Sequence, residues 1–221
     1  MALRTFGIIG LSSFGHYLAL ELARAGHDVV VVDNNEEKVE AIKDFVAKAV
    51  IADASDRKTL AELGLKQCDA VIVSLGTSID VSILVTLYLK EMGIRHIMVK
   101  AITPDQGKIV ELIGANEVVY PERDMALRVA NKLRFPNVIE QMTVGENLQL
   151  VEIMVPDSFV GKTLSQLDLR KQYQVQVVLL RSSGTEKTTL LPAGDRALQK
   201  GQILVVLGET KPIERFQREW Q

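Results

Sequence analysis

A glycine-containing loop at residues 10–15 is the first place where residue types and spacing point to chemistry. The sequence Gly10-Leu11-Ser12-Ser13-Phe14-Gly15 follows an apolar run at residues 6–9 and precedes a segment with helical spacing. Gly10 permits a tight turn between strand and helix, and Gly15 permits close packing of the helix on the strand. The N-terminus of such a helix presents N–H groups and a partial positive charge to a phosphate. The loop therefore predicts the phosphate-binding turn of a dinucleotide fold.

An aspartate follows this loop at the distance that a dinucleotide fold requires. Asp33 stands twenty-three residues after Gly10 and ends a second apolar run at residues 29–32. Its carboxylate can accept hydrogen bonds from ribose hydroxyls, and hydrogen bonds to a charged group contribute about 1.5–3 kcal/mol each. A free 2′-hydroxyl suits Asp33 better than a 2′-phosphate does. The aspartate does not distinguish NAD from ADP or ATP.

The middle of the loop departs from the glycine pattern. Ser12 stands where the fingerprint has its second glycine, so its Cβ lies where a pyrophosphate normally approaches the backbone. One interpretation is that the loop only packs the sheet and that nucleotide binding has been lost. The strand before the loop and Asp33 after it favour the other interpretation, in which the loop holds a nucleotide.

These residues need a sheet that brings the ends of its strands to one edge. Short apolar runs rich in β-branched residues recur in the first 120 residues and alternate with segments of helical spacing such as 17–25 and 36–45. Continuous apolar strands that alternate with helices are typical of a parallel sheet covered on both faces. The pattern predicts a Rossmann-like, doubly wound α/β sheet. The apolar runs span residues 6–9, 29–32, 49–51, 70–74, 96–99 and 117–120.

The pattern changes after about residue 142, which indicates a second, small α+β domain. Its expected strands span residues 148–155, 174–181 and 202–207, with a helix over 165–171 and a turn at Ser183-Gly184. Thr210-Lys211-Pro212 is expected to begin a last short helix.

A helix from about residue 124 ends at Phe135-Pro136, because proline disfavours helix in the residue before it. We therefore expect an N-terminal domain over residues 1–135, a hinge over 136–146 and a C-terminal domain over 147–221.

Composition excludes several classes of protein. The 221 residues are 47% hydrophobic and 24% charged, which is typical of globular chains and not of disordered or fibrous ones. A net charge of −2 gives no field for binding nucleic acid. Asp80 and Lys90 interrupt the best candidate for a membrane span, and no signal segment is expected. Cys68 alone forms neither an internal disulfide nor a zinc site, and the expected location is the cytosol.

The ends of the later strands carry further recognisable residues. Asp53-Ala54-Ser55, Ser74-Leu75-Gly76, Val99-Lys100-Ala101 and residues 121–126 follow the third to sixth strands, and residues 160–164, 167–170 and 200–208 mark the second domain. In this order they resemble the landmarks of the RCK (regulator of potassium conductance) domains of the Ktr and Trk potassium-uptake regulators. Only one N–C pair is present, which is similar to the Ktr-type regulators.

The resemblance implies a cytoplasmic regulatory subunit. Its relatives form homodimers that assemble into an octameric ring beneath an integral-membrane potassium-translocating subunit, so the chain would be peripheral at the inner face of the membrane. ADP or ATP, and in some relatives NAD(H), occupies the N-domain cleft and changes the shape of the ring. The residues that the resemblance and the loop together assign to this cleft are Gly10, Ser12, Ser13, Phe14, Gly15, Asp33, Asp53, Ala54, Ser74, Gly76, Lys100 and Glu122.

The resemblance also implies two further ligands. Glu122 matches a carboxylate that is associated with activation by ATP together with a divalent or monovalent cation. Arg170 lies in the segment that matches the cyclic di-AMP groove of some relatives. Asp53 is a candidate either for contact on the adenine side or for capping the next helix, and Ser55 is expected to cap that helix.

This chain departs from the family pattern at two places. Relatives usually read Gly-Leu-Gly-Arg-Phe-Gly where this chain has Ser12 and Ser13, so an arginine that would reach the terminal phosphates is missing. The segment 181–184 lacks the histidine found in relatives that bind cyclic di-AMP.

An NAD(H)-dependent oxidoreductase or redox sensor is the alternative function. The sequence holds no Tyr-x-x-x-Lys pair, no His-Asp relay after the sheet and no nucleophile elbow, so we expect a regulator and not an enzyme. Gly161-Lys162-Thr163 resembles the tail of a P-loop, but Pro156 stands where the first glycine is needed.

Overall fold

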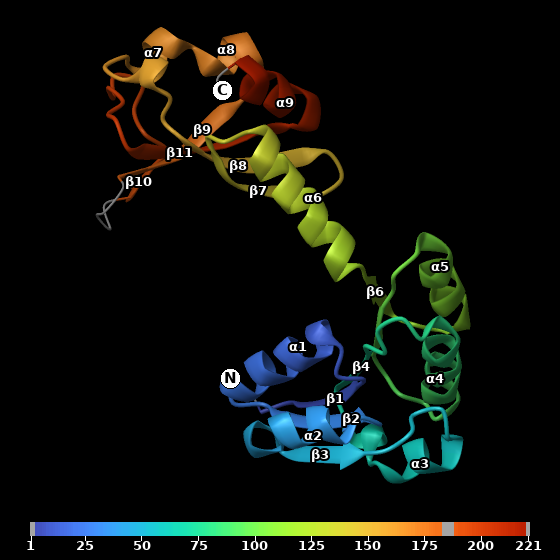
Figure 1. The fold of residues 1–221 in the computed structure, drawn as a ribbon. Coiled ribbons are helices and arrows are strands. Elements are labelled where there is room, and N and C mark those ends of the chain that lie inside the picture. Colours follow the sequence, from blue (N-terminus) through green and yellow to red (C-terminus); the bar gives the residue numbers. More distant parts are fainter. Residues whose placement is uncertain (1–2, 183–187, 220–221) are drawn as a thin grey trace. The chain divides into compact units, whose positions relative to one another are not determined.

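The computed structural model describes residues 3–182 and 188–219 (Figure 1). The chain divides into two compact units, Met1–Asp124 and Met125–Gln221, which are described in turn.

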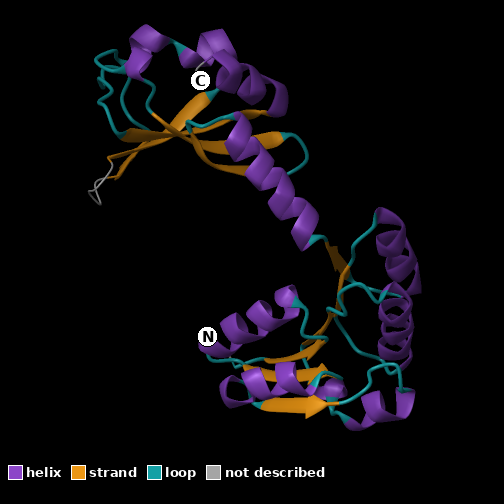
Figure 2. Ribbon diagram, viewed as in Figure 1, coloured by secondary structure: helices purple, strands orange, loops and turns teal. Residues whose placement is uncertain are grey.

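The first unit is built on a parallel sheet with the strand order β3-β2-β1-β4-β5-β6 (Figure 2). Its order is that of a doubly wound dinucleotide fold, so the predicted Rossmann-like class is confirmed. The strands are β1 (Thr5–Ile9), β2 (Asp28–Asp33), β3 (Lys48–Ile51), β4 (Ala70–Val73), β5 (Ile97–Lys100) and β6 (Glu117–Val119), and the helices are α1 (Ser13–Arg24), α2 (Glu36–Ile42), α3 (Arg57–Glu62), α4 (Ile79–Glu91) and α5 (Pro104–Ile113).

Both faces of this sheet are buried, which explains its continuous apolar strands. Successive side chains of a strand point to opposite faces. Ile8 and Val31 accordingly belong to one apolar cluster, while their neighbours Ile9 and Val32 belong to another. All four side chains are fully buried. The two clusters fix the register of β1 and β2 and thereby the position of the loop that follows β1.

Local capping explains where the helices of this unit begin. Asn35 caps α2 by accepting the N–H of Lys38 at 3.0 Å, and Thr103 caps α5 ahead of Pro104 at the first helical position. The expectation that Ser55 caps the next helix is wrong. Asp56 caps α3 by accepting the N–H of Lys58 at 3.1 Å, while the side chain of Ser55 is bonded to Asp53.

The second unit is an antiparallel sheet with the strand order β10-β9-β11-β8-β7. Its core gathers around the fully buried rings of Phe159 and Phe216, which lie between the helices and one face of the sheet. The strands are β7 (Val138–Val144), β8 (Leu148–Met154), β9 (Gln176–Ser182), β10 (Thr188–Leu190) and β11 (Gln202–Glu209), and the helices are α6 (Pro121–Arg134), which begins in the first unit, α7 (Leu164–Leu167), α8 (Leu169–Tyr173) and α9 (Thr210–Glu219).

The second unit matches the α+β class that the sequence predicts. The expected strands and the last helix from Thr210 are present. Residues 138–144, which fall in the segment expected to be a hinge, form β7 and pair with β8. The expected turn at Ser183-Gly184 lies outside the described residues. Among the residues that the structure describes, no helix is long and apolar enough to span a membrane.

Candidate functional site at the carboxyl edge of the parallel sheet

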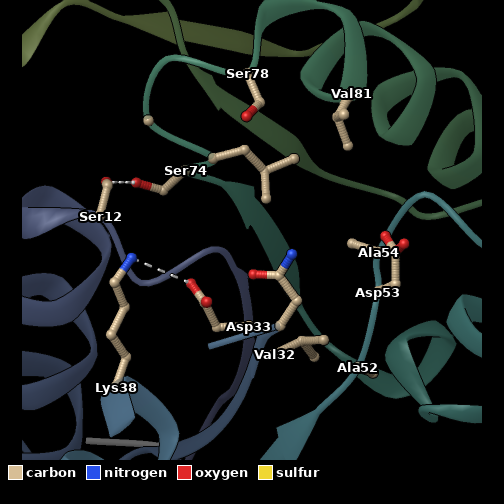
Figure 3. A pocket seen from close by; sticks show the side chains of 13 residues that line it. Ser12, Val32, Asp33, Lys38, Ala52, Asp53, Ala54, Ser74, Ser78 and Val81 are labelled. Carbon is tan, nitrogen blue, oxygen red and sulfur yellow. Dashed lines mark hydrogen bonds and ion pairs between the residues drawn. The ribbon is translucent and has the colours of Figure 1, made fainter. Parts of the chain in front are cut away.

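A cavity of about 220 Å³ lies at the carboxyl ends of the parallel strands (Figure 3). Strands β1 to β3 follow one another toward one edge of the sheet, and strands β4 to β6 follow one another toward the other edge, so the direction reverses between β1 and β4. Ligands of open α/β sheets bind in the crevice at such a switch point. The lining comes from the end of β2, from the loops that follow β1, β2, β3 and β4, and from the first turns of α2 and α4. The cavity is lined by Ser12, Val32, Asp33, Asn34, Lys38, Ala52, Asp53, Ala54, Ser74, Leu75, Gly76, Ser78 and Val81.

The glycines of the first loop are required by close backbone contacts. Gly10 has a φ of +92°, and its N–H donates to the carbonyl of Val32 at 2.7 Å. A Cβ at Gly10 would lie 2.5 Å from the carbonyl oxygen of Ser74, and one at Gly15 would lie 2.3 Å from the carbonyl oxygen of Gly10. The loop can therefore turn directly from β1 into α1 between β2 and β4.

Asp33 holds this loop in place as well as lining the cavity. Its Oδ2 accepts the N–H of Leu11 at 2.6 Å, and its Oδ1 accepts the N–H of Asn35 at 2.8 Å. The ammonium of Lys38 lies 3.9 Å from Oδ2, and Figure 3 shows it pointing toward the carboxylate. Each carboxylate oxygen has two lone-pair positions, so Asp33 keeps acceptor capacity for a ligand hydroxyl.

Asp53 presents a second carboxylate to the cavity. Its Oδ1 accepts the hydroxyl of Ser55 at 2.7 Å and the N–H of Ser55 at 2.8 Å. These hydrogen bonds hold the pKa of Asp53 below its ordinary value, because they favour the charged form. The neighbouring Ala54 is buried and forms part of the same wall.

Two serine hydroxyls meet on the opposite side of the cavity. The Oγ atoms of Ser12 and Ser74 lie 2.6 Å apart and share a hydrogen bond. Ser74 is fully buried at the carboxyl end of β4. Ser12 is the N-cap of α1, but its side chain makes no capping hydrogen bond, because its hydroxyl is directed to Ser74.

The structure brings some of the sequence-predicted residues together and leaves others apart. Ser12, Asp33, Asp53, Ala54, Ser74 and Gly76 line one cavity, and Gly10 and Gly15 shape its loop. Ser13 is exposed and does not line this cavity. Phe14 lines a separate apolar cavity beside Phe6 and Leu18. Arg170 lines a cavity of about 360 Å³ in the second unit.

Lys100 and Glu122 form an ion pair outside the lining of the cavity. Lys100 is buried at the end of β5, whereas the side chain of Glu122, at the start of α6, is 66% exposed. Partial burial raises the pKa of Glu122, but the hydrogen bond from Lys100, a backbone N–H and the charge of Lys100 outweigh it and leave the pKa below its ordinary value.

Sequence reasoning did not identify Lys38, Ser78 and Val81 as lining residues. Lys38 is the one cationic side chain among the described residues that line the cavity. A usable signal was its position in the first turn of the helix after Asp33, which the cap residue Asn35 begins. Ser78 and Val81 lie at the start of α4, which faces the cavity because α4 follows β4 at the switch point.

Comparison with protein families gives two matches that follow one another along the chain. The TrkA-N domain model matches residues 6–121, and the TrkA-C domain model matches residues 149–219.

Among known proteins, the Ktr system potassium uptake proteins are similar over almost the whole chain. Protein C of Bacillus subtilis (strain 168) is 36% identical over 215 residues, which cover 97% of this chain and 96% of that protein. Protein A of the same organism is 35% identical over 98% of this chain and 96% of that protein. Protein A of Vibrio alginolyticus is 36% identical over 205 residues, which cover 93% of this chain and 92% of that protein.

Among solved structures, the RCK domain of GsuK is similar with a TM-score of 0.66 at 20% identity, covering 99% of this chain. A structure of the GsuK channel bound to NAD gives a TM-score of 0.62 at 20% identity over 96% of this chain. This chain spans 48% and 38% of the length of those two chains. At this level of identity the likeness shows the fold.

The packing around Gly10 predicts a specific loss of stability. Gly10→Ala places a Cβ against the Ser74 carbonyl and adds strain at positive φ. Gly26 also has a positive φ, +83°, but a Cβ there would have no atom within 4 Å, so Gly26→Ala adds only the strain. We expect Gly26→Ala to cost about 1–2 kcal/mol and Gly10→Ala about 2 kcal/mol more, measured by urea unfolding. Equal losses for the two variants would contradict the packing.

The ion pair of Glu122 predicts a pH-dependent contribution to stability. Because its pKa in the folded protein lies below the ordinary value of 4.5, the contribution is present above that value and is lost as the pH falls through the folded pKa. Glu122→Gln should therefore melt below the native protein near pH 7, and the gap should close as the pH falls below 4.5 and through the folded pKa. Glu111→Gln, at an exposed position of α5, is the control. A difference in melting temperature between Glu122→Gln and the native protein that persists in acid would show that the ion pair is not the source of the difference.

Proposed function

The chain belongs to the family of Ktr system potassium uptake proteins, in which a TrkA-N domain is followed by a TrkA-C domain, and on that premise we propose that it is the nucleotide-sensing regulatory subunit of a potassium uptake system. The observation that carries this proposal is the cavity at the switch point. There the carboxylates of Asp33 and Asp53 share one cavity with the hydroxyls of Ser12 and Ser74 at the N-terminus of α1.

The proposed ligand is an adenine nucleotide, ADP or ATP. Asp33 accepts hydrogen bonds from the ribose hydroxyls, and the buried Ala54 together with the exposed Asp53 takes the adenine side. The phosphates lie at the N-terminus of α1, where free N–H groups and the helix dipole favour an anion. GsuK has been solved bound to NAD and, in another structure, bound to ADP, so NAD(H) is the competing ligand to test.

A binding role accounts for the site better than redox chemistry does. The described residues around the cavity supply carboxylates, hydroxyls and one lysine, all of which suit recognition of ribose and phosphate. An NAD(H)-dependent oxidoreductase needs in addition a donor or base beside the nicotinamide and a second pocket for its substrate. The relatives are named as potassium uptake proteins, which supports a regulator over an enzyme.

The proposed partners are a second copy of this chain and an integral-membrane potassium-translocating subunit. Helix α6 supports the homodimer, because none of its residues is buried although it is amphipathic, and its apolar side chains Met125, Leu127, Val129 and Leu133 are exposed. We extend the proposal to an octameric ring of dimers on the cytoplasmic side of the membrane, as the resemblance to the Ktr-type regulators implies.

The described residues of a single chain do not complete a cation site at Glu122. The ammonium of Lys100 already neutralises this carboxylate, and the described residues hold no group of three or more His, Cys, Asp or Glu side chains that could bind a metal ion. A cation that accompanies ATP therefore remains a prediction that needs ligands from outside the described residues of one chain.

The cavity beside Arg170 is the proposed place for a second ligand. Arg170 contributes a guanidinium, and Leu169, Val175, Val177 and Pro192 give the same cavity an apolar wall. A cation beside apolar surface suits a nucleotide with an anionic backbone and flat bases. Cyclic di-AMP is the candidate to test there.

The proposed regulation is a shift between two conformations. A ligand changes such an equilibrium only through a difference in its affinity for the two states. The N-domain nucleotide would favour one geometry of the ring, and that geometry would favour one state of the membrane partner.

The test of nucleotide binding is thermal unfolding of the purified chain with ADP. At about 100 times its dissociation constant, a ligand adds about 2.7 kcal/mol of stability. Asp33→Ala should abolish this gain, because it removes the ribose acceptor and frees the loop at Leu11. Asp28→Ala, which removes the same charge at the exposed start of β2, should keep it. No gain with ADP or ATP in the native chain, or an equal gain in Asp33→Ala, would overturn the proposal.

A further inference from the structure

The ammonium of Lys38 lies beside Asp33 without a hydrogen bond to it. Its Nζ is 3.9 Å from Oδ2 of Asp33, which is close enough for an ion pair but too far for a hydrogen bond (Figure 3). Within the part of the chain that the structure describes, Asp33 is the one acidic side chain within ion-pair distance of this ammonium. An ammonium has three N–H donors, so Lys38 keeps all of them for a ligand.

Asp33 does not depend on Lys38 for its partners. Its carboxylate already accepts the N–H groups of Leu11 and Asn35, at 2.6 and 2.8 Å. The side chain of Lys38 is 48% exposed, whereas that of Asp33 is 7% exposed. Because a lysine side chain has a long and flexible stem, Lys38 can turn toward a ligand while Asp33 stays in place.

Lys38 lies within reach of the N-terminus of α1. The Asp33 oxygen that faces the ammonium is the one that accepts the N–H of Leu11, the residue just before Ser12. Ser12 is the N-cap of α1, and it lines the same cavity as Lys38. Its hydroxyl is directed to Ser74 and caps none of the first N–H groups of the helix, which have no partner within the helix. An anion that accepts from these N–H groups therefore lies close to the Lys38 ammonium.

The charges around the cavity make Lys38 important for an anionic ligand. Asp33 and Asp53 bring two carboxylates, and Lys38 brings the one cationic side chain among the described residues of the lining. Ser12 and Ser13, in the loop after β1, bring no charge. The N-terminus of a helix contributes the equivalent of about half an elementary charge, which does not offset two carboxylates. Without Lys38, the charges around the cavity would disfavour a phosphate.

We infer that Lys38 is a phosphate-binding residue of this chain. Its ammonium contacts the phosphates of the bound nucleotide at the N-terminus of α1 and supplies the positive charge that the loop at Ser12 and Ser13 lacks. Asp33 keeps its place beside the ribose. The inference rests on the proposed function, because it assigns a role in binding to a residue of the same cavity.

The experiment is calorimetric titration of ADP into the native chain, Lys38→Met and Lys38→Arg, each at low and at high salt. Methionine removes the charge and keeps an unbranched side chain, whereas arginine keeps the charge. A hydrogen bond to a charged group is strong enough that its loss lowers an affinity by about tenfold or more. We expect Lys38→Met to bind ADP about tenfold more weakly than the native chain at low salt. The difference should shrink at high salt, because salt screens an exposed charge, and Lys38→Arg should keep most of the affinity.

Lys43→Met is the matched control. The side chain of Lys43 is 49% exposed, pairs with Glu40 and does not line the cavity. Thermal unfolding of every variant without ligand establishes that it is folded.

Two kinds of failure are distinguishable. An ADP affinity that Lys38→Met leaves unchanged, or that Lys43→Met lowers as much, would overturn the inference and leave the proposed function standing. A loss in Lys38→Met by the same factor at both salt concentrations would also overturn it, because the lysine would then act only by positioning Asp33. Binding of neither ADP nor ATP to the native chain would overturn the inference and the proposed function together.

Discussion

The carboxylate of Asp33 ties the first loop of the parallel sheet to the end of β2, because one oxygen accepts the N–H of Leu11 at 2.6 Å and the other accepts that of Asn35. A carboxylate buried to this degree is stable only when its oxygens are hydrogen-bonded. The same contact sets the direction of the first turn of α1 and places an acceptor in the cavity. The rest of the site depends on it, because Ser12 can meet Ser74 only if the loop holds this path between β2 and β4.

Much of the site could be predicted because it follows from strand ends. A parallel sheet brings the residues after its strands to one edge, so the Gly10 loop and Asp33 could be grouped from their spacing, while Asp53, Ser74 and Gly76 were expected in the site from the family resemblance. What the sequence did not show is how the side chains pair. That Ser12 bonds to Ser74 and not to its own helix depends on the distance between β1 and β4, which are neighbours in the sheet although Ser12 and Ser74 lie 62 residues apart in the sequence.

Other differences have local causes. Phe14 faces an apolar cavity because it lies on the side of α1 that packs with Phe6 and Leu18. Lys100 at the end of β5 and Glu122 at the start of α6, which the family resemblance implies at an intersubunit nucleotide site, are paired with each other in the single chain, and their role in that site stays a prediction. The strand β7 was not identified because Glu140, Gln141 and Thr143 interrupt its apolar residues. Its pairing with β8 supplies the hydrogen bonds that the sequence of β7 alone does not reveal.

The central claim is that an adenine nucleotide lies at the switch point with its phosphates on α1. Hydrogen–deuterium exchange of the full chain with and without ADP tests this claim most directly, since exchange reports which backbone N–H groups a ligand protects. The account predicts slower exchange in residues 10–16, 33–38 and 74–78 with ADP, and unchanged exchange in the sheet of the second unit. Protection confined to the cavity beside Arg170, or binding of ADP without protection of residues 10–16, would contradict it.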